Sequence, residues 1–251
     1  MSKKTKNKKT KREFKSKKSS QNKILLVVGL AVFAAILGYF YFTENSTQTS
    51  TLSKEKLDSI EVSLDLEKIE GKYTLLSNTP STSEAGKIEM LEFLSFYCGH
   101  CYALNEKMPE LMQTYGDKIK LIHIPIVWGQ STMSVEAYLI AEEMGKGEEM
   151  KDALFKANFE NRMDISDIDV LDAIAKDIGL DETEFNKKLE QGYASKVAWE
   201  NIKLTQKYSV YETPTIIIYN KIKVTPANTN GKIDLMVDNL NTILQSIIEE
   251  M

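Results

Sequence analysis

A short apolar segment that runs straight into a pair of cysteines is the feature that most limits how this chain can fold. The segment KIEMLEFLSF (87–96) has the length and the apolar content of a buried strand, and it ends just before Cys98. From Cys98 onward, apolar residues recur at helical spacing. The pattern predicts a helix that opens at Cys98 and Cys101, is kinked by Pro109 and ends at Gly116.

Further segments extend this strand and helix into an α/β domain. We expect a second buried strand (118–128), a helical region (about 134 to 207), two more strands (213–219 and 221–226) and a closing amphipathic helix (234–248). This order indicates an α/β sheet with a helical domain inserted midway. Cys101 and Thr213 are 112 residues apart, far more than one strand and one crossover helix require, so the surplus is the inserted domain.

Local signals mark the helix ends inside the inserted region. The residues at 166–169 (Ser-x-x-Asp) and 181–184 (Asp-x-x-Glu) resemble capping boxes, which begin helices. Gly179 and Gly192 stand where helices would end. The region is therefore expected to contain several short helices.

The N-terminal part of the chain is predicted to anchor it in a membrane. Residues 24–42 are nineteen residues without a charge, and at about 1.5 Å per residue they approach the roughly 30 Å hydrocarbon core of a bilayer. Residues 1–23 hold eleven Lys or Arg and one acid, and such a positive flank stays in the cytoplasm. We expect a single-pass type II protein whose residues from Thr43 onward face the periplasm or the outside.

Two other interpretations of this region were weighed. A cleaved signal peptide usually has an apolar region of about 7 to 15 residues that ends in small residues, whereas this run is longer and ends in Tyr39-Phe40-Tyr41-Phe42. A basic arm can also bind nucleic acid, but a basic stretch beside a membrane span is explained by orientation and by contact with anionic lipid. We therefore expect no nucleic-acid partner.

The chain divides into six segments on this interpretation. They are a cytoplasmic basic segment (1–23), a transmembrane helix (24–42), a Ser/Thr-rich flexible linker (43–56), the first part of the sheet domain (57–130), the inserted helical domain (131–207) and the second part of the sheet domain (208–251).

The spacing of the two cysteines, which are the only two in the chain, favours redox chemistry. One helical turn brings positions i and i+3 to the same face, and the free N–H groups and dipole at the helix start favour a thiolate at Cys98. Cys98 is therefore the expected nucleophile, and His100 can add positive charge or a hydrogen bond. Cys101, further into the helix, is the expected resolving thiol, which closes an internal disulfide and releases a bound substrate. Beyond this redox-active Cys98–Cys101 disulfide we expect no cofactor.

Two alternatives for the cysteines were considered. A structural zinc site needs four ligands, and the chain offers only His100 and His123 besides the cysteines, so we expect no metal. A structural disulfide suits a domain on the oxidising side of a membrane, but it would close a very short loop and so add little stability.

The motif LEFLSFYCGHCYALN (91–105), together with the inserted helices and the later ETPT (212–215), resembles the DsbA-type thiol:disulfide oxidoreductases. The resemblance extends roughly from Tyr73 to the C-terminus. It implies a thioredoxin fold interrupted by a helical domain, and it implies attack by Cys98, resolution by Cys101 and a thiolate stabilised by His100.

The resemblance also assigns roles to three residues outside the cysteine motif. It makes Glu92 a buried acid below the active site, Pro214 a cis-proline opposite the dithiol, and Thr213 the residue whose backbone pairs with a substrate peptide. From the residues alone, strand alternation places Glu92 on the face opposite Leu91 and Phe93, where it is either a solvent-facing carboxylate on an edge strand or a buried proton relay for the resolving thiol.

The resemblance implies a function, with the direction of electron flow left open by two residues. We expect an oxidase in a bacterial inner membrane that introduces disulfides into exported proteins, with its catalytic domain in the periplasm or extracytoplasmic space and a quinone-linked DsbB-like partner. Gly99 resembles disulfide isomerases, and Thr213 before the proline is commoner in isomerases and reductases. The alternative is therefore an isomerase of misoxidised proteins, or a reductase, kept reduced by a DsbD-like partner. A third possibility is a peptide-binding chaperone or assembly factor whose dithiol is incidental.

Overall fold

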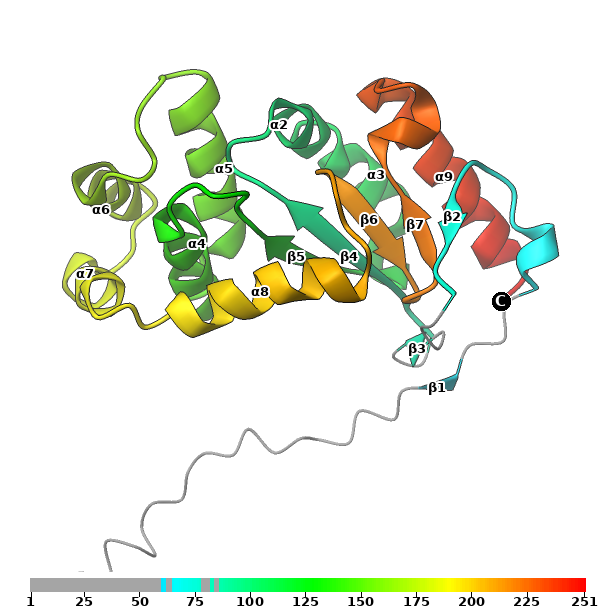
Figure 1. The fold of residues 1–251 in the computed structure, drawn as a ribbon, viewed down its shortest axis with the longest axis horizontal. Helices are drawn as coiled ribbons and strands as arrows, with labels where there is room; N and C mark the ends of the chain where they lie inside the picture. The colour runs from blue at the N-terminus through cyan, green and yellow to red at the C-terminus, as the bar shows by residue number, and fades with distance from the viewer. Residues whose placement is uncertain (1–59, 62–64, 78–81, 84–85) are drawn as a thin grey trace, which may run out of the picture. The chain divides into compact units, whose positions relative to one another are not determined.

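A five-stranded mixed sheet forms the centre of the part of the chain that the computed structural model describes, which comprises residues 60–61, 65–77, 82–83 and 86–251 (Figure 1). Among these residues, no helix is both long and apolar enough to cross a bilayer. The predicted segments 1–23, 24–42 and 43–56 lie outside the described residues.

The sheet places one central strand between a parallel and an antiparallel neighbour. Its order is β2 (Thr74–Leu75), β7 (Ile222–Val224), β6 (Thr215–Ile218), β4 (Ile88–Leu94) and β5 (Ile119–Pro125). β4 runs parallel to β5 and antiparallel to β6, and the other neighbouring pairs are antiparallel. The apolar run at 87–96 therefore forms a buried strand inside the sheet, and its burial is what its composition predicts. A separate two-stranded ladder joins β1 (Ile60–Glu61) to β3 (Thr82–Ser83).

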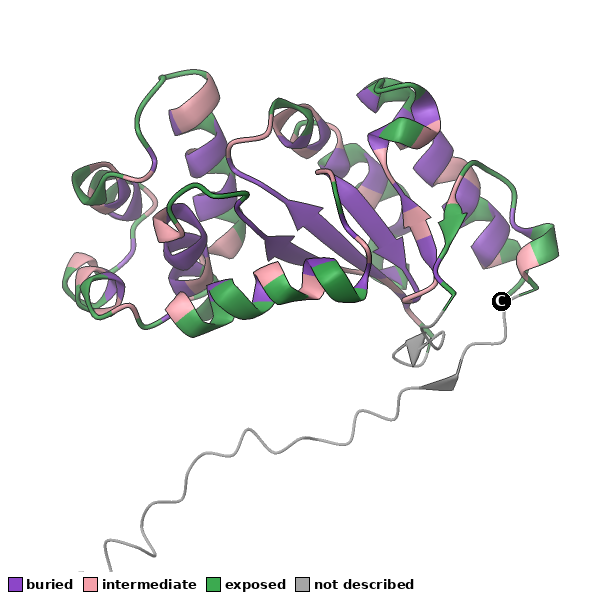
Figure 2. Ribbon diagram, viewed as in Figure 1, coloured by how far each residue is buried: buried purple, intermediate pink, exposed green. Residues whose placement is uncertain are grey.

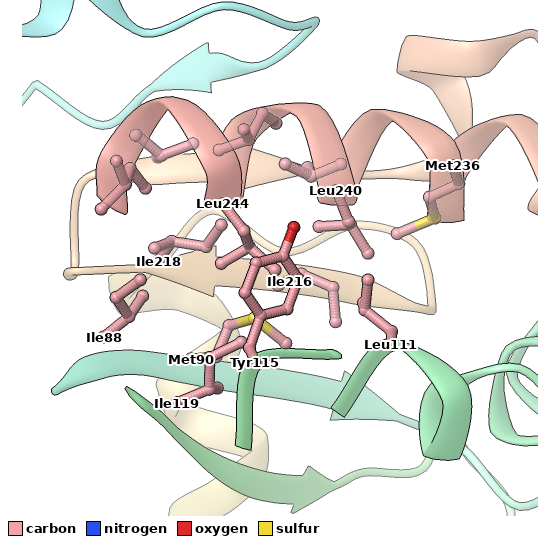
Figure 3. Packing of buried hydrophobic residues seen from close by; sticks show 14 of the residues in the cluster. Ile88, Met90, Leu111, Tyr115, Ile119, Ile216, Ile218, Met236, Leu240 and Leu244 are labelled. Atoms are coloured by element: carbon pink, nitrogen blue, oxygen red, sulfur yellow. The ribbon is translucent and has the colours of Figure 1, made fainter. Parts of the chain in front are cut away.

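One face of the sheet packs on the closing helix. α9 (Ile233–Glu249) and α3 (Met108–Tyr115) cover this face, and Figure 3 shows Leu240 and Leu244 of α9 directed at the side chains of the sheet. The strand residues in this cluster are fully buried: Ile88, Met90, Ile216 and Ile218. α9 is thus the amphipathic helix expected at 234–248.

The opposite face packs on the end of α8 (Ser195–Lys207) and the residues that follow it. Phe93 and Ile217 project from the strands on this side, and Tyr208 stacks at a tilt on Phe93 with ring centroids 5.6 Å apart. α8 lies within the segment predicted as the inserted domain, yet its C-terminal end covers the sheet. Figure 2 shows the consequence, since the central strands are buried on both faces.

Four helices precede α8 and share a second core. They are α4 (Met133–Glu143), α5 (Gly147–Phe159), α6 (Ile168–Asp177) and α7 (Glu182–Glu190). The glycine signals are correct, because Gly179 and Gly192 follow α6 and α7 with φ of +79° and +61°. Asp181 caps α7 as expected, by accepting a hydrogen bond from the backbone N–H of Glu184 at 2.9 Å.

Two local predictions are wrong. Asp167, and not Ser166, caps α6, because the backbone N–H and the hydroxyl of Ser166 both donate to Asp164. Pro109 does not kink one long helix. The chain instead breaks into α2 (Gly99–Asn105) and α3, in which Pro109 lies in the first turn, where its missing N–H leaves no hydrogen bond unmade.

The described part of the chain also contains three short 3₁₀ helices: η1 (Leu66–Lys68), η2 (Gly116–Lys118) and η3 (Pro226–Thr229). η2 follows α3 directly, and Gly116, at the end of α3, has a φ of +57°, as the predicted helix end requires.

Candidate active site at the start of helix α2

A tight turn after β4 places Cys98 at the N-cap of α2, directly before its first residue. The backbone N–H of Cys98 donates to the carbonyl of Ser95 at 3.0 Å, and Cys98 has the extended backbone of an N-cap residue. Its sulfur accepts a hydrogen bond from the backbone N–H of Cys101 at 3.4 Å. A helix start leaves such N–H groups without partners inside the helix, so a sulfur at the N-cap can use them.

The two cysteines differ in their access to solvent. Both are free thiols, Cys98 is half-buried, and Cys101 is completely buried beside Leu94 and Phe96. A substrate thiol can therefore approach Cys98 and not Cys101. This is the arrangement expected for an attacking and a resolving cysteine.

A segment far along the chain contacts the same sulfur. The Cys98 thiol donates to the carbonyl oxygen of Thr213 at 3.2 Å, although the two residues are 115 positions apart. The Thr213–Pro214 peptide bond is cis, as the resemblance implied. The hydroxyl of Thr215 donates to the Glu212 carbonyl at 2.8 Å and so helps to order the loop that carries Thr213.

The surroundings separate the acidities of the two thiols. The pKa of Cys98 is lowered to about 5, mainly by a hydrogen bond from the Cys101 thiol. Burial opposes this shift, whereas the contact with Thr213 and the backbone N–H groups of Cys101 and His100 add to it. Burial, together with Cys98 as a neighbour, raises the pKa of Cys101 well above the ordinary thiol range. At neutral pH the pair therefore holds one thiolate, on the accessible cysteine.

Gly99 and His100 occupy the exposed beginning of α2. His100 contributes its backbone N–H to the Cys98 sulfur, so the role assigned to its imidazole stays a prediction. A Cβ atom at Gly99 would meet Phe159 at 3.8 Å, an ordinary van der Waals distance, so packing leaves room for a side chain there.

Glu92 is buried, with a relative exposure of 3%, and it lies on the central strand, so the interpretation as a solvent-facing carboxylate on an edge strand is wrong. β4 and β5 pair Glu92 with His123, and Oε2 of Glu92 lies 3.0 Å from Nδ1 of His123. This ring nitrogen makes no well-aligned hydrogen bond, so the contact is an ion pair without directional bonding. Its part in proton transfer stays a prediction.

Helix α5 completes a cluster of four charged side chains. Oε1 of Glu148 lies 2.9 Å from Nε2 of His123, and Nζ of Lys151 lies 2.7 Å from the other Glu148 oxygen. Lys151 also lies 3.2 Å from Nε2 of His123 and is nearly fully buried. The side chain of Glu148 is 67% exposed, and it gives the buried His123 and Lys151 a partner of opposite charge at the protein surface.

The charge of His123 depends on its contacts with these neighbouring side chains. Burial alone would lower the pKa of His123, but hydrogen bonding to Glu148 and the interaction with Glu92 outweigh burial and raise the pKa to about 9. The same contact with His123 is the main cause that lowers the pKa of Glu148 to about 2. His123 and Glu148 are therefore both charged at neutral pH.

No sequence pattern predicts this cluster: His123 is a candidate only as a metal ligand, and Glu148 and Lys151 belong to no motif. The available signal was a histidine in an otherwise apolar predicted strand. A buried titratable side chain of this kind requires partners, but nothing in the sequence identifies residues on another helix as those partners.

Comparisons with known proteins agree with this geometry. The family model of the DSBA-like thioredoxin domain matches residues 89–241. The thiol:disulfide interchange protein DsbA of Burkholderia cepacia is 22% identical over 156 residues, which cover 62% of this chain and 74% of that protein. The protein of the same name from Haemophilus influenzae is 25% identical over 160 residues, which cover 62% and 77%. The crystal structure of Pseudomonas aeruginosa DsbA has a similar fold, with a TM-score of 0.59 and 20% identity over 71% of this chain and 95% of that one.

The two thiols should differ sharply in their reaction with an alkylating reagent. Only thiolates react, so the rate of Cys98 modification by iodoacetamide in the reduced protein should be half-maximal near pH 5, while Cys101 stays unmodified in the folded state. Mass spectrometry of the digested protein measures both rates. In denaturant both cysteines should react alike, and a half-maximal rate for Cys98 near pH 8.5 in the folded protein would contradict the assignment.

The charged cluster should make folding stability depend on pH in a defined window. The pKa of His123 is raised from 6.5 to about 9, so its stabilisation is complete below pH 6.5 and is lost as the pH rises through 9. The pKa of Glu148 is lowered from 4.5 to about 2, so its stabilisation is present above pH 4.5 and is lost as the pH falls through 2. Both contributions are complete between pH 4.5 and pH 6.5, so the cluster should stabilise the fold most in this window. Urea unfolding at a series of pH values measures the free energy of unfolding.

The substitution Glu148→Gln tests the cause of this dependence. Removing an opposite charge should lower the pKa of His123 by roughly one unit or more, as followed by NMR titration of the imidazole. Glu149→Gln is the matched control, since Glu149 is the next residue of α5 and pairs with Lys146 at 2.8 Å. Equal shifts in the two variants, or a wild-type His123 that titrates near 6.5, would show that the cluster does not hold the imidazole charged.

Proposed function

We propose that this chain, which belongs to the DSBA-like thioredoxin domain family and is a thiol:disulfide oxidoreductase, introduces disulfide bonds into exported proteins through Cys98 and Cys101. The observation that carries the proposal is the position of the Cys98 sulfur, which lies at the N-terminus of α2 and accepts from backbone N–H groups. These donors stabilise the thiolate of the reduced enzyme. A more stable reduced form makes the Cys98–Cys101 disulfide a stronger oxidant.

The proposed reaction has two exchange steps. A substrate thiolate attacks the Cys98 sulfur of the oxidised enzyme, the bond between Cys98 and Cys101 breaks, and Cys101 leaves and takes up a proton. A second substrate thiolate then attacks the mixed disulfide at the substrate sulfur, which forms the substrate disulfide and releases Cys98 as a thiolate. The low pKa of Cys98 makes it a good leaving group in this second step. Two electrons have then passed to the enzyme, and a membrane oxidant of the quinone-linked DsbB type removes them.

The remaining site residues receive proposed roles around this exchange. The backbone of Thr213, whose carbonyl already contacts Cys98, pairs with the substrate peptide, and Pro214 shapes that loop. Glu92 serves as the buried acid that exchanges the proton of Cys101, His100 assists the thiolate, and Gly99 tunes the reduction potential.

We propose that the enzyme works from a membrane. The uncharged residues 24–42 and the basic residues 1–23 favour a single-pass type II anchor in a bacterial inner membrane, with 43–56 as a linker. The sheet domain (57–130 and 208–251) and its inserted helices (131–207) would then face the periplasm or extracytoplasmic space, where reduced exported proteins emerge.

Serine substitutions should separate the roles of the two cysteines. Cys98→Ser should abolish oxidation of a reduced peptide that contains two cysteines, because no sulfur remains for the first attack. Cys101→Ser, activated with an aromatic disulfide, should accumulate a mixed disulfide with a peptide that contains a single cysteine, because neither Cys101 nor a second peptide thiol is present to resolve it. Since the chain has no other cysteine, any such adduct must be at Cys98. Full activity of Cys98→Ser would refute the mechanism, and full complementation by the double variant would favour a chaperone.

A second candidate is an isomerase or reductase, which two specific residues favour. Gly99 lacks the side chain for which the structure has room, and Thr213 precedes the cis-proline. In this case the dithiol would be kept reduced by a DsbD-like membrane donor, and its substrates would be misoxidised exported proteins.

The cellular redox state of the dithiol should distinguish the two directions. An oxidase that is reoxidised by a membrane partner should be found mostly oxidised when intact cells are acid-quenched and free thiols are labelled. Labelling of the Cys101→Ser variant provides the one-thiol reference on the gel. A mostly reduced dithiol in wild-type cells, together with a strongly reducing potential, would reject the oxidase and leave the isomerase or reductase.

A further inference from the structure

The last turn of α5 contacts the active-site segment on both sides of the cysteines. Before them, the ring of Phe155 meets the ring of Phe96 edge-on, with centroids 5.3 Å apart. After them, the ring of Phe159 stacks on Tyr102 at 5.1 Å, with an angle of 7° between the planes. A helix of the inserted region therefore brackets the dithiol.

Between these two ring contacts lies a single directed hydrogen bond. The side-chain amide of Asn158 donates to the backbone carbonyl of Phe96 at 2.8 Å. Phe96 is two residues before Cys98, in the turn that connects β4 to α2. The same turn is held from within by Ser95, whose carbonyl accepts from the N–H of Cys98 at 3.0 Å and whose hydroxyl oxygen accepts from the N–H of Tyr97 at 3.3 Å.

We propose that Asn158 is a positioning residue of the dithiol centre, which fixes the Phe96 carbonyl from α5 and thereby holds the Cys98 sulfur against the N-terminus of α2. The proposal rests on the proposed function in one respect, namely that Cys98 is the attacking cysteine. Asn158 touches no reacting atom. It acts through the backbone of the turn, whose Phe96 carbonyl accepts a hydrogen bond from this side chain of α5.

The physical reason is that hydrogen bonds to a sulfur depend on direction. The N–H of Cys101 reaches the Cys98 sulfur at 3.4 Å, a distance with little margin, so a small rotation of the turn weakens the bond. Internal hydrogen bonds alone leave such a turn free to shift as a unit on the end of β4. A donor on a packed helix removes that freedom, and it also prevents the buried Phe96 carbonyl from losing its partner.

The structure supplies a matched control for this contact. Asn105, at the end of α2, donates its side-chain amide to Asp152 of α5, also at 2.8 Å. This hydrogen bond joins α5 to α2 beyond the cysteines, whereas that of Asn158 joins α5 to the turn before them. Asn158→Ala and Asn105→Ala therefore each remove one side-chain hydrogen bond that involves α5, and only the first is directed at the turn that carries Cys98.

The two variants are compared in the full-length protein by titration of the thiolate absorbance at 240 nm and by equilibrium with glutathione. Asn158→Ala should raise the pKa of Cys98 by roughly half a unit to one unit, the amount that corresponds to one hydrogen bond. Its disulfide should become a weaker oxidant by about three- to tenfold in the equilibrium constant. Asn105→Ala should leave both quantities unchanged.

The outcomes separate this proposal from the proposed function. A Cys98 pKa that is unaltered in a folded Asn158→Ala variant, or equal shifts in both variants, would overturn the positioning role while Cys98 remains the nucleophile. Loss of all exchange in Cys98→Ser supports the proposed function whatever Asn158 does. If Asn158→Ala does not fold, hydrogen exchange in the wild type decides: the side-chain amide protons of Asn158 should be protected, and free exchange with solvent would overturn the proposal.

Discussion

The contact on which the site depends is the one between the Cys98 sulfur and the N-terminus of α2. It exists because β4 ends at Leu94 and the chain turns within a few residues into a helix, which leaves backbone N–H groups directed at the cysteine. These donors come from the backbone, so their part in stabilising the thiolate depends on the turn and not on the side chain at position 99 or 100. The differing acidities of the two thiols then follow from depth, since the same turn exposes Cys98 and buries Cys101.

Helix α5 connects the inserted region to the sheet at both of its ends. Near its start, Glu148 and Lys151 meet His123 of β5, and through His123 they reach Glu92 of β4. At its end, Asn158 reaches the turn after β4. His123, Lys151 and Glu92 of this cluster are buried, so moving α5 away from β5 would leave buried polar side chains without partners, which is costly. We infer that the inserted helices form one wall of the active site and are more than an appendage to the sheet.

Sequence reasoning located what depends on local pattern. The apolar run at 87–96 predicted the strand, and the helical spacing of apolar residues after Cys98 predicted the helix start, whereas alternation left Glu92 either buried or facing solvent. It failed where a side chain had a nearby competitor, as at Ser166, which donates to Asp164 and leaves the cap to Asp167. It also missed the partners of His123, which lie 25 and 28 residues along the chain on a helix whose docking no periodic pattern records. The Thr213 contact was expected only through resemblance to a family.

The site also explains why an insertion in mid-fold is compatible with exchange chemistry. The Thr213 carbonyl must meet Cys98 across 115 residues, and it does so because β6 pairs antiparallel with β4, whatever the length of the intervening chain. The sheet register therefore sets the contact of Cys98 with Thr213, and α5 sets the contacts before and after the cysteines.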